Sequence, residues 1–374
     1  MRVIDLRRDT ITLPDEAMRE AAFRAPLGDS VYGEDPKQEE LEAYAARLLG
    51  QERALFVPSG TMGNLAALLA HTHRGDELIL EENAHIRTSE SGGAAAVAGL
   101  MIRAVPSSAT LRSAGPGLRL GKGKRADVSP DGAPDPEVVE AAIRLDDIHY
   151  PRTGLICLES THYRYGGIVP PLERFARIRE IADRHGLPVH LDGARLFNAA
   201  VYLGIEAREI ARYADSVMIS LSKGLGAPVG SMLCGSEAFI ARANRARKML
   251  GGGMRQTGWL CACGLIALSP QNIARLADDH AQARLLAEGL AGIADGSGMP
   301  AFSVDLRRTQ TNYVLARVVS ERFDAPALVA ALREQGVLCT TSGKDTLRFV
   351  TSKQIERGDT AEALARIAGI VTGR

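Results

Sequence analysis

Short apolar runs alternate with amphipathic ones through the middle of this chain. The apolar runs predict strands at residues 53–57, 77–80, 100–105, 155–159, 188–192, 216–221 and 230–234. Between several of them apolar residues recur at helical spacing, which predicts helices at residues 61–71, 172–185 and 237–250. Strands that alternate with helices are typical of a mostly parallel sheet covered on both faces. In such sheets ligands bind beyond the carboxyl ends of the strands.

The pattern changes at residues 269–270. Beyond this point it predicts a long helix at residues 273–290, strands at 313–316 and 346–350, and helices at 326–335 and 360–371. We therefore expect an α/β fold with an N-terminal arm at residues 1–28, a large domain at 29–270 and a smaller C-terminal α/β domain at 271–374.

Composition and charge narrow the classes of function. The chain has 374 residues, and Lys+Arg and Asp+Glu each number 45, so the formal net charge is zero. This balance indicates neither a nucleic-acid partner nor an anionic membrane surface. The first ten residues do not resemble a signal peptide, and no uncharged stretch is long enough to span a bilayer. We expect a cytoplasmic protein.

Cysteine and histidine spacings predict neither a disulfide framework nor a metal site. The five cysteines are odd in number and lack a Cys-x-x-Cys pair, and Cys261 and Cys263 lie in an apolar run typical of a core. His71 and His73 supply too few ligands for zinc. Residues 106–134, rich in Gly, Ser and Pro, predict a solvated surface excursion.

Two residues at predicted strand ends suggest a cofactor. Lys223 follows the 216–221 strand among small residues, so other atoms can approach its amine. A reachable, partly desolvated amine is what a Schiff-base lysine requires. Asp192 ends the 188–192 strand, where a carboxylate can pair with a protonated pyridine nitrogen. A surface lysine and a helix N-cap are the ordinary alternatives, but both residues in this order indicate pyridoxal phosphate.

A third and a fourth element fit the same interpretation. Ser59, Gly60 and Thr61 join a strand to a helix, and exposed N–H groups at a helix N-terminus favour a phosphate. An ordinary strand–helix turn explains this segment equally well. His85 follows the 77–80 strand and could stack on the cofactor ring, although a structural role is the commoner one for such a histidine.

Longer segments resemble the threonine aldolases, which have the aspartate-aminotransferase fold (fold type I). The matches extend over nearly the whole chain and include DLRRDTITLP, SGTMGNLAAL, HLDGARLFNA, SLSKGLGAPVGS and RKMLGGGMRQTG. The resemblance implies a pyridoxal-phosphate enzyme that cleaves L-threonine, L-allo-threonine or a related β-hydroxy-α-amino acid to glycine and an aldehyde. It also implies a homotetramer with active sites shared between subunits, acting on a small amino-acid substrate.

The resemblance further implies roles for single residues. Lys223 would bind the cofactor covalently, Asp192 would pair with the pyridine nitrogen, and Ser59, Gly60 and Thr61 would hold the phosphate. His85 would stack on the ring, and Glu90 would lie near this catalytic histidine. The substrate carboxylate would bind Arg195 and Arg348, with Arg8 beside it, and the β-hydroxyl would lie between His85 and His149. A neighbouring subunit's site would be reached by Tyr32, Lys248 and Arg255. Arg195 and Arg255 are also expected near the cofactor.

Departures from the family pattern lie at the expected substrate end. Arg8 stands where the family usually has serine, and Ser160 and Tyr163 replace two asparagines. The alternatives are therefore a β-eliminating lyase or a small amino-acid racemase on the same scaffold, and more remotely a non-catalytic cofactor-binding protein. The base that takes the β-hydroxyl proton stays open between His85 and His149, with Lys223 as a third candidate.

Overall fold

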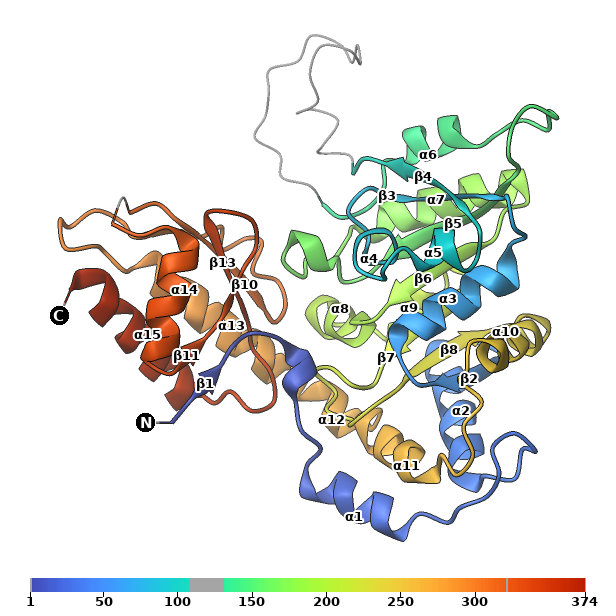
Figure 1. Cartoon of the computed structure of the whole chain (residues 1–374), viewed down its shortest axis with the longest axis horizontal. Helices are drawn as coiled ribbons and strands as arrows, with labels where there is room; N and C mark the ends of the chain where they lie inside the picture. The colour runs from blue at the N-terminus through green and yellow to red at the C-terminus, as the bar shows by residue number, and fades with distance from the viewer. Residues whose placement is uncertain (1, 108–130, 321, 374) are drawn as a thin grey trace.

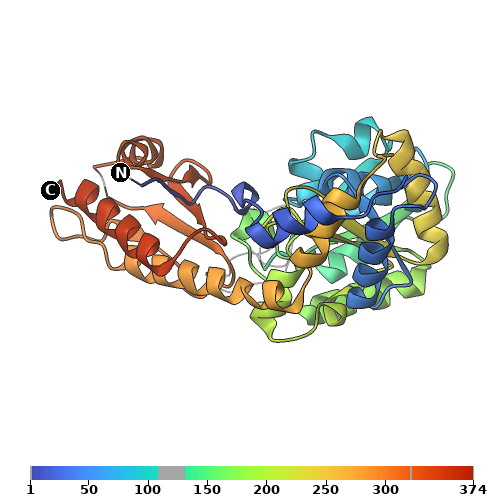
Figure 2. The same ribbon diagram turned by 90° about the horizontal axis from the view of Figure 1, so that it is seen from below.

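The computed structural model describes residues 2–107, 131–320 and 322–373. The ribbon has a larger part built on one sheet and a smaller part built on another, with the N-terminal segment crossing between them (Figure 1). Helix α13 (Leu276–Ala291) runs from the larger part into the smaller one, as the turned view shows (Figure 2).

A seven-stranded sheet forms the centre of the larger part of the described chain, in the order β2-β8-β7-β6-β5-β3-β4. Strand β8 is antiparallel to both of its neighbours, and the remaining pairs are parallel. The strands are β2 (Arg53–Val57), β3 (Glu77–Glu81), β4 (Met101–Val105), β5 (Thr153–Glu159), β6 (Val189–Gly193), β7 (Ser216–Ser220) and β8 (Ser231–Gly235). The predicted α/β fold with a mostly parallel sheet is confirmed, and each predicted strand lies within two residues of its observed bounds.

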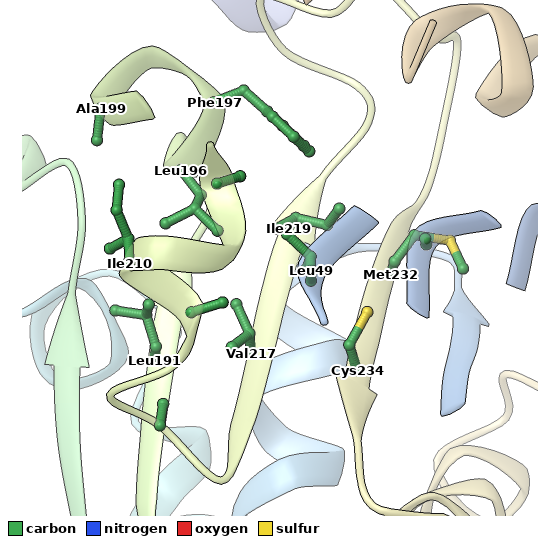
Figure 3. Packing of buried hydrophobic residues seen from close by; sticks show 14 of the residues in the cluster. Leu49, Leu191, Leu196, Phe197, Ala199, Ile210, Val217, Ile219, Met232 and Cys234 are labelled. Carbon is green, nitrogen blue, oxygen red and sulfur yellow. The ribbon is translucent and has the colours of Figure 1, made fainter. Parts of the chain in front are cut away.

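Helices cover both faces of this sheet. Because side chains alternate along a strand, Val217 and Ile219 of β7 pack into one buried cluster and Met218 into another. Figure 3 shows the first cluster, in which Leu191, Val217 and Ile219 from adjacent strands lie beside side chains of two helices. The first cluster includes residues of α2 (Pro36–Leu49), α7 (Leu172–His185), α8 (Leu196–Leu203), α9 (Ala207–Ala211) and α11 (Gly258–Ala267), and the second those of α3 (Gly60–His71) and α10 (Glu237–Met249). The other helices here are α1 (Glu16–Arg24), α4 (His85–Thr88), α5 (Gly93–Ala96) and α6 (Pro136–Ala142).

The smaller part has its own core. Its four-stranded sheet has the order β12-β13-β10-β9, made of β9 (Phe302–Ser303), β10 (Tyr313–Val318), β12 (Thr340–Thr341) and β13 (Thr346–Val350). Helices α13, α14 (Ala325–Glu334) and α15 (Arg357–Thr372) pack with it. Strand β1 (Ile4–Asp5) pairs with β11 (Val337–Leu338), so Ile4 and Leu6 are buried in this core. The domain bounds named above stay predictions.

The helix predicted at residues 273–290 begins earlier than its apolar pattern suggests. Helix α12 (Pro270–Ala274) starts at a proline in the first helical position, where the missing N–H costs nothing. The Ser269 side chain accepts a hydrogen bond from the N–H of Asn272 and caps it. Ser269 and Pro270 are therefore a helix start.

Two further expectations concern the chain outside the sheet. Among the described residues no single helix is long and apolar enough to cross a membrane, although the bent pair Gly258–Ala267 and Pro270–Ala291 passes by length and composition. Ser107 and Pro134 form an isolated β-bridge. The surface excursion predicted for residues 106–134 lies mostly outside the described residues and stays a prediction.

Candidate active site

The carboxyl ends of β6 and β7 bring Asp192 and Lys223 to one edge of the sheet. The two strands are adjacent and parallel, and Lys223 lies just beyond the end of β7. Asp192 is buried, and its Oδ1 accepts a hydrogen bond from the N–H of Ala194 at 3.1 Å. Its Oδ2 accepts another from Asn64 Nδ2 at 3.0 Å. The charge of Asp192 acts on the Lys223 amine, so the two predicted residues share one site.

The Lys223 amine is poised to lose its proton. Burial, together with the positive charge of Arg195, lowers the pKa of Lys223 to about 8, against the opposing charges of Asp192, Asp9 and Glu159. A measurable share of the amine is therefore neutral near pH 7, and only the neutral form is nucleophilic. The backbone of this loop is fixed as well, because Thr12 Oγ1 donates a hydrogen bond to the carbonyl of Lys223 at 2.7 Å.

Arg195 lies in the site but is not a free carboxylate clamp. Its Nε and Nη2 donate to the two oxygens of Asp9 at 2.7 and 2.6 Å, and its guanidinium lies 5.0 Å from the centre of the Tyr313 ring. Burial acts to raise the pKa of Asp9, but the charge and hydrogen bonds of Arg195 lower it overall. Asp9 engages two of its nitrogens and leaves Nη1, so the expected contact of Arg195 with a substrate carboxylate would use Nη1 and stays a prediction.

Arg348 approaches the same place from the smaller part of the chain. It lies on β13 opposite Leu315 of β10. Burial raises the pKa of Tyr313 to about 12, while the charges of Arg195 and Arg348 act in the opposite sense, so both guanidinium groups lie near one ring. The Nε atom of Arg348 is buried without a hydrogen-bond partner in the described part of the chain. This unpaired donor is available to an acceptor that binds there.

His85 is held by two carboxylates. Its Nδ1 lies 3.0 Å from Glu90 Oε1, and its backbone N–H donates to Glu159 Oε2 at 2.7 Å. Burial alone lowers the pKa of His85, but the hydrogen bond to Glu90 and the charges of Asp192, Glu90 and Glu159 raise it overall. The ring of Tyr163 meets the His85 ring edge-on at 5.5 Å. Because Glu90 engages Nδ1, Nε2 is the nitrogen left for a ligand.

The N-terminus of α3 packs closely on β7 and leaves two backbone N–H groups available to a ligand. The Ser59 hydroxyl caps the helix by accepting from the N–H of Met62 at 3.2 Å. The N–H groups of Gly60 and Thr61 precede the first helical hydrogen bonds, so they can serve an anion. A Cβ at Gly60 would lie 3.2 Å from Met218 Cε, which shows that glycine also lets α3 pack closely on β7.

Comparison with known proteins identifies the family. Residues 5–320 match the family model described as β-eliminating lyase. The chain belongs to the β-eliminating lyase family. Low-specificity L-threonine aldolase 1 of Arabidopsis thaliana is 42% identical over 363 residues, covering 96% of this chain and 94% of that protein. Low specificity L-threonine aldolase of Escherichia coli (strain K12) is 41% identical over 363 residues, covering 97% and 98%. The solved threonine aldolase of Leishmania major shares the fold, with a TM-score of 0.79 at 19% identity over 98% of this chain and 99% of that one.

One expected site residue lies away from the others within the chain. His149 is in the loop that precedes β5, whereas Glu159 and Asp192 lie at the carboxyl ends of their strands and Lys223 follows β7. β5 has seven residues, so about 20 Å of strand separates the two ends. The His149 side chain is 78% exposed and contacts Asp147 at 2.8 Å. The pairing of His85 with His149 around one β-hydroxyl is therefore not formed by a single chain.

Three other residues expected at a shared site are also on the surface. Tyr32 and Lys248 are exposed, and Arg255 makes an exposed ion pair with Asp29 at 3.1 Å. Arg8 is exposed just before the buried Asp9. The structure therefore does not bring Arg8 into contact with Lys223 or Asp192, and its expected place beside the substrate stays a prediction.

Sequence reasoning missed three buried residues of the site. Each contacts a residue that was predicted for the site. Asp9 accepts from Arg195, Asn64 donates to Asp192, and Glu159 accepts from the backbone N–H of His85. Asp9 and Asn64 lie within segments that match the family, and Glu159 ends a predicted strand. Their positions in these segments were the available signal that they belong to the site. Their contacts could not be inferred, because their partners are far away in sequence.

One group of ligand atoms has the spacing of a metal site. In the described part of the chain, His85, Glu90 and Asp192 offer atoms within 4.8 Å of one another. These atoms are engaged with each other and with Asn64. We interpret the group as part of the cofactor pocket.

Proposed function

We propose that this chain is a pyridoxal-phosphate-dependent aldolase that cleaves L-threonine, L-allo-threonine or a related β-hydroxy-α-amino acid to glycine and an aldehyde. The observation that carries the proposal is the convergence of Lys223 and Asp192 at one edge of the sheet, with the Lys223 pKa lowered to about 8. Membership of the β-eliminating lyase family and 41–42% identity to low-specificity L-threonine aldolases support it.

The residues present fit pyridoxal phosphate. Lys223 offers a partly neutral amine for the aldehyde, and Asp192 offers a buried carboxylate for the pyridine nitrogen. The N–H groups of Gly60 and Thr61 at the start of α3 could donate to the phosphate. When bound, the cofactor supplies an electron sink for the pair released as the Cα–Cβ bond breaks.

Two arginines orient the substrate. The unpaired Nε of Arg348 and the remaining Nη1 of Arg195 can bind its carboxylate, while Asp9 fixes the Arg195 plane. Holding the carboxylate would fix the direction of the Cα–Cβ bond within the site. Correct orientation is worth about 7–11 kcal/mol in the best cases.

His85 is the base that best fits one chain. Glu90 engages its Nδ1, so neutral His85 keeps its lone pair on Nε2, where it can take the β-hydroxyl proton. The Cα–Cβ bond then breaks, the aldehyde leaves, and Cα takes up a proton to give glycine. The raised pKa of His85 strengthens it as a base.

We also propose that the enzyme works as a cytoplasmic homotetramer with shared sites. His149, Tyr32, Lys248 and Arg255 are exposed, and apolar side chains accompany them. Ile148, next to His149, is 97% exposed, an unusual state for a large apolar residue. A second chain that covers this loop would bring His149 to its own Lys223. All five cysteines are free and buried, which fits a reducing compartment.

The test is aldehyde release. Purified protein with added pyridoxal phosphate is incubated with L-threonine, L-allo-threonine and phenylserine, and the aldehyde is followed by its reduction with alcohol dehydrogenase and NADH or by ultraviolet absorbance. We expect acetaldehyde or benzaldehyde with equimolar glycine, and none from Lys223→Ala. Alanine and serine are tested alongside. Racemisation of alanine, with no aldehyde from any of the three β-hydroxy amino acids, would reject the aldolase and favour the racemase. Pyruvate released from serine would favour β-elimination.

Subunit complementation tests the shared site. Lys223→Ala should be inactive and His149→Ala should lose activity if the neighbouring chain's His149 completes the site. Mixing and reassociating them should then restore up to about a quarter of the wild-type activity, because some sites receive both intact residues. Light scattering gives the oligomeric state of each variant. A mixture that stays inactive although hybrid tetramers form would contradict sharing.

A further inference from the structure

Asn64 occupies a buried junction that the proposed reaction leaves without a role. It lies on α3 with no exposed surface. Its Nδ2 donates to Glu90 Oε1 at 2.8 Å and to Asp192 Oδ2 at 3.0 Å. One amide therefore links Asp192, the carboxylate that would pair with the pyridine nitrogen, to Glu90, the carboxylate that contacts His85. Both protons of this amide are in use, so its orientation decides whether the two carboxylates are bridged or repelled.

A chain of hydrogen bonds holds the other end of the amide. Asn64 Oδ1 lies 3.1 Å from His190 Nε2, His190 Nδ1 lies 2.8 Å from Ser216 Oγ, and Ser216 Oγ lies 2.8 Å from His71 Nε2. Asn64, His190 and Ser216 are fully buried. His71 ends the chain stacked on Phe239, with ring centres 4.4 Å apart.

Each donor in this chain can be assigned. Burial lowers the pKa of His190 to about 4 and that of His71 to about 3, so both rings are neutral near pH 7. Ionised carboxylates only accept, so the Asn64 NH₂ faces them and Oδ1 faces His190. His190 must then carry its proton on Nε2 and accept on Nδ1 from the Ser216 hydroxyl. The oxygen of Ser216 in turn accepts from His71 Nε2. All bonds thus run in one direction, from His71 towards Asp192.

We propose that Asn64 is a positioning residue of this active site, and that the buried chain through His190, Ser216 and His71 fixes its amide so that Asp192 and Glu90 stay bridged. The inference rests on the proposed function only for the identity of the cofactor. It predicts that His190, two residues before Asp192 in β6, acts on cofactor binding only through Asn64.

The variants follow from the assigned donors. His190→Gln keeps an N–H donor at the place of Nε2, whereas His190→Leu removes it and leaves Asn64 Oδ1 unpaired. Asn64→Leu removes the bridge itself. His280→Leu is the control, because His280 is also a neutral histidine with an amide partner, Asn198, at 3.1 Å, although it is only half-buried.

The measurement is the dissociation constant of pyridoxal phosphate, from titration of the apoenzyme followed by visible absorbance. An unpaired buried acceptor weakens an equilibrium by about tenfold, so we expect roughly that loss for His190→Leu and at least as much for Asn64→Leu. His190→Gln should stay within about twofold of the wild type, and His280→Leu should unfold more easily with unchanged cofactor affinity. The double variant Asn64→Leu/His190→Leu should bind like Asn64→Leu alone.

Several results would overturn the inference. Losses that multiply in the double variant would mean that His190 does not act through Asn64. Equal losses in His190→Gln and His190→Leu would mean that the donor is irrelevant, and an equal loss in His280→Leu would mean that any buried histidine has the same effect. Cofactor binding is measured without turnover, so a wild-type protein that binds cofactor but releases no aldehyde would reject the proposed function and leave this test intact.

Discussion

Replacing Asp9 by asparagine should destabilise the protein more than any single change of a surface charge. Asp9 has no exposed surface, the Arg195 side chain is 9% exposed, and two hydrogen bonds of 2.6 and 2.7 Å join them. Removing one partner leaves the other charge buried and unpaired, which costs about 3–5 kcal/mol. Asn312 Nδ2 also loses its charged acceptor at 3.1 Å. The Michaelis constant for threonine should rise as well, because Arg195 is no longer held in one plane.

Urea unfolding at fixed protein and cofactor concentrations measures this cost. Asp305→Asn is the control, because Asp305 pairs at 3.2 Å with an Arg307 side chain that is 91% exposed, and such pairs contribute below about 1 kcal/mol. A loss for Asp9→Asn that is no larger than that of the control would refute the reasoning. The pH dependence has a definite sign. The pKa of Asp9 is lowered in the folded state, so the pair stabilises above the ordinary aspartate pKa of about 4, and this contribution is lost as the pH falls through the lower folded value.

Three further outcomes are expected. The rate at which apoenzyme takes up pyridoxal phosphate, followed by stopped-flow absorbance, should rise with pH around a midpoint near 8, because the pKa of Lys223 is about 8 and only its neutral amine reacts; a rate flat from pH 6 to 9 would contradict this. Glu90→Gln should move the acid limb of the kcat profile to lower pH, because Glu90 raises the pKa of His85 and the neutral ring is the active base; an unmoved limb would exclude His85 as the base. Gly230→Ala should lower the free energy of unfolding by about 1–3 kcal/mol, since its φ is +104° and the new Cβ would lie 2.4 Å from Phe56 Cε2; a loss below that range in thermal unfolding would show that the ring yields.

Much of the fold could be predicted because local and long-range signals agree. The helix predicted at residues 172–185 has the observed bounds, since its apolar face packs on the sheet and Gly186 ends it in the left-handed region with φ of +62°. The start of α12 was misplaced, because the Ser269–Pro270 pair was interpreted as a boundary between domains. The pairing of β1 with β11 could not be foreseen, since 332 residues lie between Ile4 and Val337 and no local pattern encodes a contact over that separation.

The same division holds within the site. Lys223 and Asp192 were accessible to prediction because each follows a strand and its chemistry depends on residue type. The role of Arg195 was not, because whether a guanidinium meets a substrate or a second side chain depends on a residue 186 positions away, Asp9. The match of Arg195 to the family pattern does not show which side chain it pairs with. Contacts such as Asn64 with His190 and Asp192 arise only when α3 is packed on β6.

The predicted strands already distinguished His85 from His149 as candidate bases, although both were left open in the sequence analysis. Parallel strands gather the residues that follow them at one edge and those that precede them at the other. His85 follows β3, as Lys223 follows β7, whereas His149 precedes β5. The predicted strand at residues 155–159 already placed His149 on the wrong edge of its own sheet. A base at that position can act only on a site supplied by a different chain, so the candidacy of His149 requires that sites are shared between subunits, and a catalytically competent isolated monomer would reject both.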